Sequence, residues 1–143
     1  MIESSMIIND RMPEYCVERA GRILNRYKKA INGSKILILG VSYKQDIDDY
    51  RESPAFKVIE YLERNGAHVD YYDPWVPECP YKGKKYVGIP ALTGEVVEGY
   101  DLVMITTGHS NVDYELVANH AQVVFDTRNV TKPLQPRKNI VVL

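Results

Sequence analysis

The residues best suited to chemistry lie in one loop, positions 41–52, which follows a short apolar run. Lys44 and Arg51 bring positive charge, which suits a phosphate group because both side chains donate charge-assisted hydrogen bonds to phosphate oxygens. The same loop carries carboxylates that could pair with these cations: Asp46, Asp48, Asp49 and Glu52. Two interpretations therefore stay open, an anion-binding loop and a solvated loop whose charges pair with one another.

The elements around this loop predict an open parallel sheet. Residues 35–40 form a continuous apolar run, typical of a strand that is buried on both faces. Ser53-Pro54 is a helix-opening pair, with serine as the cap and proline in the first turn. Further strands are predicted at 67–72, 101–107, 122–126 and 139–143, with helices at 91–97 and 112–119 and an irregular stretch at 74–90. This alternation predicts an α/β fold, a Rossmann-like open, mainly parallel sheet with helices on both faces.

One more helix is predicted before the first strand, from Met12 to Ile31. Its apolar and small residues recur at helical spacing, Pro13 suits a first turn, and Gly33 is a stop signal. An α/β domain seldom begins with a helix that no strand precedes. We therefore divide the chain into residues 1–33, which contain this helix, and residues 34–143, the sheet domain.

The sheet order suggests a dinucleotide site, but the sequence lacks the usual fingerprint. Gly40 is the one glycine between the first strand and Gln45, where G-x-G-x-x-G would be required. Asp73, at the end of the next strand, is followed by Pro74, which favours a turn over ribose binding. The loop is about twelve residues long, against the usual two to six, at a position where α/β folds bind ligands. The sequence therefore predicts a nucleotide-binding type of fold in which a long polar loop replaces the glycine-rich turn.

Residues 40–54 read G-V-S-Y-K-Q-D-I-D-D-Y-R-E-S-P. This long pattern closely resembles the signature of the C-terminal domain of the UDP-glucose/GDP-mannose dehydrogenase family. Residues 66–77 resemble that domain's second strand with its Asp-Pro exit, and 126–129 resemble its D-x-R-N segment. Residues 8–13 resemble the end of the family's central helical region. The resemblance therefore covers essentially the whole chain.

The resemblance implies a piece of an enzyme that oxidises the C6 alcohol of a nucleotide sugar to a carboxylate with two NAD+ molecules. The piece would be the C-terminal nucleotide-sugar-binding domain, with NAD bound mainly by another part of the protein. Neither Cys16 nor Cys79 lies in the family's catalytic G-G-x-C context, so we expect this chain to have no dehydrogenase activity by itself. The D-D-Y-R-E-S-P, T-x-H-S and D-T-R-N segments are most similar to the branch that acts on UDP-N-acetylhexosamines, such as UDP-N-acetylglucosamine and UDP-N-acetylmannosamine.

The resemblance also implies residue roles. Tyr43, Lys44 and Arg128 would contact the UDP-sugar, and Arg51 would reach toward NAD. For three residues a structural role stays open: Arg51 as a partner of Asp48 or Asp49, Tyr43 as a packing residue, and His109 as a plain loop residue. Other polar residues of these segments are expected to be structural: Asp49 and Glu52 as braces, Ser53-Pro54 as a helix cap and Asp73-Pro74 as a turn.

Composition narrows the remaining possibilities. The net charge of −1 gives no support for nucleic-acid binding, and no apolar run approaches the roughly 18 residues of a membrane span. Three scattered histidines suggest no metal site. Two cysteines outside any CxxC pair predict free thiols in a reducing cytoplasm. The resemblance implies a homodimer through the central dimerisation helix, of which residues 1–33 would be the end. We therefore expect this helix to bury only part of its apolar stripe within this chain. Two alternatives are a stand-alone nucleotide-sugar-binding or regulatory module, and an unrelated NAD-binding Rossmann protein, against which the missing glycines count.

Overall fold

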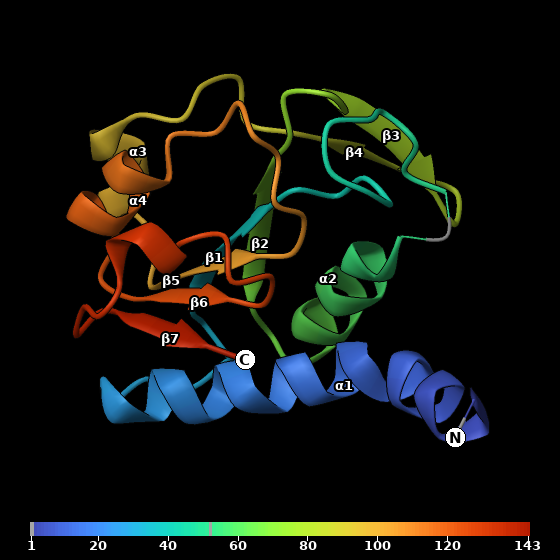
Figure 1. Cartoon of the computed structure of the whole chain (residues 1–143), viewed down its shortest axis with the longest axis horizontal. Helices are drawn as coiled ribbons and strands as arrows, with labels where there is room; N and C mark the ends of the chain where they lie inside the picture. Colours follow the sequence, from blue (N-terminus) through green and yellow to red (C-terminus); the bar gives the residue numbers. More distant parts are fainter. Residues whose placement is uncertain (1, 52) are drawn as a thin grey trace.

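The computed structural model describes residues 2–51 and 53–143, with the side chains of residues 2–11 outside that description. Its centre is a five-stranded parallel sheet in the order β2-β1-β5-β6-β7 (Figure 1). The strands are β1 (Lys35–Leu39), β2 (His68–Tyr72), β5 (Leu102–Ile105), β6 (Val124–Asp126) and β7 (Ile140–Val142). The chain adds β2 on one side of β1 and then crosses to β5 on the other. The predicted parallel sheet is thus confirmed, with its topological switch point between β1 and β5.

Helices cover both faces of the sheet, as predicted (Figure 1). One face packs on α1 (Ile2–Arg26) and α2 (Pro54–Arg64), and the other on α3 (Gly94–Glu98) and α4 (Tyr114–His120). Successive strand residues point to opposite faces, so Ile36 and Ile38 lie in the first core while Leu37 and Leu39 lie in the second. Burial on both sides explains why β1 is apolar throughout.

Helix α1 differs from the prediction at both ends. It begins at Ile2 and continues through Pro13, and it ends at Arg26 instead of Ile31. The stop is Lys28, which takes a left-handed φ of 61° while the N–H groups of Tyr27 and Lys29 donate to the Leu24 carbonyl at 2.9 and 3.1 Å. A left-handed residue just after the last turn is a common helix ending, although glycine usually takes this position because it has no Cβ.

The apolar stripe predicted for this helix is partly buried within the chain, as expected. Cys16, Ala20, Ile23 and Leu24 are buried against α2 and the sheet, whereas Ile31 is half-buried and Tyr27 is 36% exposed. Arg19 lies over the stripe, with its guanidinium 5.4 Å from the Phe125 ring and its Nη2 donating to the Val142 carbonyl at 3.2 Å. Tyr15 remains exposed on the helix surface.

The stretch 74–90, expected to be irregular, contains an antiparallel hairpin of β3 (Glu78–Tyr81) and β4 (Lys84–Val87). Lys82 and Gly83 connect the strands with φ values of 48° and 77°, the geometry that two-residue hairpin turns favour. Tyr81 stacks on Phe56 of α2 with ring centroids 5.0 Å apart, which fixes the hairpin to the helix. Pro80 is tolerated because a two-stranded ribbon has free edges.

Within the described residues, no helix combines the length and the apolar character that crossing a membrane requires. The short helix η1 (Lys132–Leu134) lies between β6 and β7.

Gly40 is the tightest point of the switch region, and we expect Gly40→Ala to destabilise the fold. The residue has a φ of +90°, and an added Cβ would lie 2.5 Å from the carbonyl oxygen of Thr107. Gly33 has a similar φ of +87° but open space around it, so Gly33→Ala isolates the cost of the backbone conformation. We expect a loss of roughly 1–2 kcal/mol for Gly33→Ala, and at least about 2 kcal/mol more for Gly40→Ala, in urea unfolding. Equal losses would contradict the close packing of β1 against the loop after β5.

Candidate functional site

A cavity of about 580 Å³ opens beside the carboxyl ends of β1, β5 and β6. Tyr43 and Lys44 line it from the loop after β1, Thr106 from the loop after β5, and Thr127 and Arg128 from the loop after β6. Its apolar wall comes from α1 and α2 and includes Met12, Pro13, Cys16, Pro54 and Val58. The three residues expected to contact a substrate, Tyr43, Lys44 and Arg128, are thus brought to one hollow.

Arg128 is held in place by its own turn. Its backbone N–H donates to Oδ1 of Asp126 at 3.0 Å, and its Nε donates to the Thr106 carbonyl at 3.0 Å. Asp126 is fully buried and also accepts from the N–H and hydroxyl of Thr131, at 2.8 and 2.5 Å. Within the described residues, no protein acceptor binds the two Nη nitrogens of Arg128, so both can meet an anion in the cavity.

Lys44 and Tyr43 line the cavity from the loop after β1. Both side chains are exposed, and the Lys44 ammonium lies 5.9 Å from the centre of the Tyr43 ring. Among the side chains that the structure describes, no carboxylate forms an ion pair with Lys44. The acidic neighbours are engaged elsewhere, because Asp46 binds Ser110 and Asp49 binds Arg51. The loop charges therefore pair selectively and leave one cation facing the hollow.

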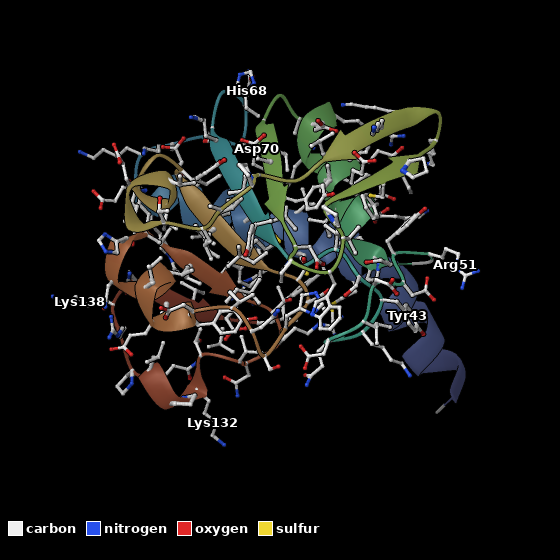
Figure 2. All side chains as sticks on the ribbon, turned by 90° about the horizontal axis from the view of Figure 1, so that it is seen from above. Tyr43, Arg51, His68, Asp70, Lys132 and Lys138 are labelled. Atoms are coloured by element: carbon white, nitrogen blue, oxygen red, sulfur yellow. The ribbon has the colours of Figure 1, made fainter. Side chains whose placement is uncertain are left out.

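Arg51 lies outside this cavity. It lines a neighbouring hollow of about 670 Å³ between the start of α2 and the β3–β4 hairpin, together with Tyr50, Lys57, Tyr81 and Lys82 among others. Its Nε and Nη2 donate to the Asp49 carboxylate at 3.0 and 3.3 Å, and this contact holds the pKa of Asp49 below its usual value. Figure 2 shows Arg51 and Tyr43 on the same flank of the molecule. Asp49 is thus the brace that was expected, whereas Glu52 lies outside the described residues.

A buried polar network holds the start of the loop. The side chain of Asp73 has no exposed surface, and its Oδ2 accepts hydrogen bonds from the N–H groups of Val41 and Ser42 at 2.8 and 3.1 Å. His109 contributes Nε2 at 2.9 Å from the same oxygen. Oδ1 accepts from the N–H of Trp75 at 2.8 Å, which is the turn expected after β2. One carboxylate therefore joins the loops after β1, β2 and β5.

Burial raises the pKa of Asp73, but the hydrogen bonds from His109, Val41 and Trp75 outweigh it, so the pKa lies below its usual value. The carboxylate is therefore charged at neutral pH, and it accepts donors from three directions. Such a group is costly to leave without partners, which makes it a strong constraint on the loops that supply them.

His109 fixes the far end of the loop segment that carries Tyr43 and Lys44. Its Nδ1 accepts the N–H of Asp46 at 2.7 Å, so that nitrogen carries no proton and Nε2 is the donor toward Asp73. Its Nε2 also lies 3.1 Å from the Ser42 hydroxyl, which donates to the Lys44 carbonyl at 2.7 Å. His109 is fully buried, which agrees with a loop role and not with a position on the cavity wall.

Sequence reasoning assigned Asp73 to a turn and His109 to a loop, and it missed that the two side chains bind each other. They are 36 positions apart in the chain. The contact depends on β2 and β5 flanking β1, which places the loops after three neighbouring strands side by side. The sequence does place polar residues directly after three predicted strands. Their contact cannot be predicted from this alone, because it depends on which strands are neighbours in the sheet.

A cationic hollow at the switch point of a parallel sheet, without a glycine-rich turn, defines an α/β nucleotide-ligand domain that does not use the dinucleotide fingerprint. Residues 37–133 match the UDP-glucose/GDP-mannose dehydrogenase family, UDP binding domain, and the chain belongs to this family.

Relatives agree with this membership. The chain is 34% identical over 138 residues to a UDP-N-acetyl-D-mannosamine dehydrogenase of Methanocaldococcus jannaschii, covering 91% of this chain and 30% of that protein. It is 33% identical over 105 residues to a UDP-N-acetyl-D-glucosamine 6-dehydrogenase of Salmonella typhi, covering 71% and 24%. The structure of UDP-D-ManNAc dehydrogenase from Pyrococcus horikoshii superposes with a TM-score of 0.73 at 28% identity, covering 94% and 31%. The chain thus spans about 30% of the length of such relatives.

The Asp73 network yields a test with a defined pH dependence. We expect Asp73→Asn to lower the free energy of unfolding at pH 7 by roughly 2–4 kcal/mol, because a buried charged acceptor is lost. The folded-state pKa is lowered, so the wild-type contribution is complete above the unfolded value of about 3.9 and is lost as pH falls through the folded value. The gap between the two proteins should therefore shrink below about pH 4.

Urea unfolding at pH 7 and pH 3 measures this gap, with Asp48→Asn as the control because Asp48 is an exposed carboxylate of the same loop. A gap that stays constant across this pH range, or an Asp73→Asn variant as stable as the wild type, would show that the network is not a major constraint.

Proposed function

We propose that this chain is the UDP-sugar-binding part of an NAD-dependent UDP-sugar 6-dehydrogenase, and that it takes a UDP-N-acetylhexosamine. The observation that carries the proposal is the convergence of Lys44, Arg128 and Tyr43 on one cavity within a UDP binding domain. The relatives named above, which act on UDP-N-acetylmannosamine and UDP-N-acetylglucosamine by their names, support the choice of sugar.

The cavity offers what a nucleoside diphosphate requires. Two cations from different loops, Lys44 and Arg128, would neutralise the diphosphate, and each charge-assisted contact contributes roughly 1.5–3 kcal/mol. The exposed Tyr43 ring would pack on a flat face of the ligand, while Pro13, Pro54 and Val58 provide an apolar wall. A volume of about 580 Å³ lies within the usual range of roughly 300–1,000 Å³ for small-ligand sites.

In the proposed enzyme, NAD accepts the hydrides when the C6 alcohol is oxidised. This chain's own part is to bind and orient the UDP-sugar. Cys16 lines the cavity, but burial raises the pKa of its thiol more than Arg128 and Arg19 lower it. A protonated, buried thiol is a poor nucleophile, so we assign Cys16 to packing. Arg51, in the hollow that also contains Lys57 and Lys82, is the residue we assign to the cofactor side.

We further propose that residues 1–33 end a central helical region through which two copies associate. In Figure 1 the N-terminal end of α1 extends beyond α2 and the rest of the fold. Tyr15, on the described part of this helix, is 45% exposed. Cys16 and Cys79 are both free and buried, which favours a reducing compartment, and we place the protein in the cytoplasm.

UDP binding tests the proposed site. In calorimetry with UDP, we expect Lys44→Ala and Arg128→Ala each to raise the Kd about ten- to a hundredfold, because each removes one charge-assisted phosphate contact. Lys138→Ala is the control, since Figure 2 places Lys138 on the opposite flank from Tyr43, and its Kd should equal that of the wild type. Wild-type affinity in both cavity variants, or a chain that does not bind UDP, would contradict the proposed function.

Sedimentation tests the proposed dimer. We expect the 143-residue chain to self-associate and Tyr15→Glu to weaken association at least about tenfold, since a charge at the surface of α1 would be buried in the interface. Tyr27→Glu is the control, because Tyr27 is 36% exposed and lies just beyond the C-terminal end of α1. A monomer at high protein concentration, or equal weakening by both substitutions, would contradict an interface on α1 around Tyr15.

A further inference from the structure

We propose that His109 is a positioning residue for the UDP-sugar site, which sets the affinity of the cavity by fixing the segment 42–46 that carries Tyr43 and Lys44. The inference rests on the proposed function, because it assumes that these two residues contact the nucleotide. His109 itself has no exposed surface and does not line the cavity, so its role is to position other residues.

The geometry is that of a two-point clamp. At one end of the segment, Nε2 of His109 lies 3.1 Å from the Ser42 hydroxyl and 2.9 Å from Oδ2 of Asp73. At the other end, Nδ1 accepts the backbone N–H of Asp46 at 2.7 Å. Both nitrogens of one buried ring are therefore used, and the two ligand-facing residues lie between the two points.

The two ends differ in how much they depend on His109. The start of the segment is also held by Asp73, which binds the N–H groups of Val41 and Ser42, and by Thr107, whose hydroxyl donates to the Ser42 carbonyl at 2.7 Å. The far end is anchored at Asp46, through Nδ1 of His109 and through the Asp46 carboxylate bound to Ser110. Both ends thus have further anchors, and the Tyr43 N–H also donates to the Asp49 carbonyl at 2.6 Å. Nδ1 of His109 is the acceptor that holds the backbone N–H of Asp46 directly.

The backbone at Asp46 explains why this end needs an anchor. Asp46 has a left-handed φ of 60°, a conformation that side-chain-bearing residues seldom adopt, although aspartate tolerates it better than most. Without an acceptor for its N–H, we expect the residue to leave this conformation and the direction of the Lys44 side chain to change. Binding of the nucleotide would then have to reorder the segment, which lowers affinity.

Three substitutions separate positioning from general stability. His109→Phe keeps a ring but removes both hydrogen bonds. His109→Asn retains an acceptor near the position of Nδ1, whereas His109→Gln retains a donor near the position of Nε2. Tyr100→Phe is the matched control for stability, because it removes the hydrogen bond from the Tyr100 hydroxyl to Asp70, at 2.7 Å, without touching the loop. Figure 2 shows Asp70 away from the flank of Tyr43.

The experiment measures UDP affinity by calorimetry and amide hydrogen exchange of the free 143-residue chain. We expect the Kd to rise at least about tenfold for His109→Phe, with the asparagine variant within about threefold of the wild type and the glutamine variant weaker than asparagine. Exchange should accelerate in segment 42–46 for His109→Phe. Tyr100→Phe should be less stable but should bind UDP as the wild type does.

Four results would overturn the inference. The first is wild-type affinity in His109→Phe, which leaves the proposed function standing if Lys44→Ala still weakens binding. The second is an equal acceleration of exchange throughout the fold. The third concerns the case in which His109→Phe does not fold, when the asparagine and glutamine variants decide. UDP affinities that are equal in these two variants, or higher for glutamine than for asparagine, would contradict the clamp. The fourth, no UDP binding by the wild type, would overturn the proposed function together with the inference.

Discussion

The buried carboxylate of Asp73 is the interaction on which the ligand-facing edge of the sheet depends. It is charged, has no exposed surface, and accepts donors from the loops after three adjacent strands, β2, β1 and β5. A buried charge with fewer donors would be costly, so its presence requires these loops to converge. The carboxylate thus holds a long, polar loop against the sheet, whereas a glycine-rich turn is held there by close backbone packing.

The convergence has an electrostatic consequence for the cavity. Positions 41–52 contain four carboxylates and two cations, and simple pairing would neutralise the loop. Instead Asp46 is bound to Ser110 and Asp49 to Arg51, while Lys44 lies beside the Tyr43 ring. Arg128 is likewise oriented by the Thr106 carbonyl and not by an acidic side chain. Two cations from separate loops are therefore available at one hollow, which is the requirement for binding a diphosphate.

Much of this architecture can be predicted from local sequence. The apolar run of β1 and the Ser53-Pro54 cap indicate elements because burial and capping act over a few residues. The β3–β4 hairpin was missed because its stability comes from Tyr81 stacking on Phe56, a contact between distant segments, while the prolines of the stretch 74–90 suggest a loop. The end of α1 was misplaced because Lys28 adopts a conformation that glycine usually provides. The bond between Asp73 and His109 required the strand order itself.

The central claim is that the UDP site is the hollow between the loops after β1, β5 and β6. Titration of the isotopically labelled chain with UDP, followed by amide chemical shifts, tests it most directly. The account predicts the largest shifts at Tyr43, Lys44, Thr106 and Arg128. It predicts small shifts at His68, the first residue of β2, because this residue lies at the end of the strand away from the cavity. Shifts concentrated around His68, or no shifts at saturating UDP, would contradict it.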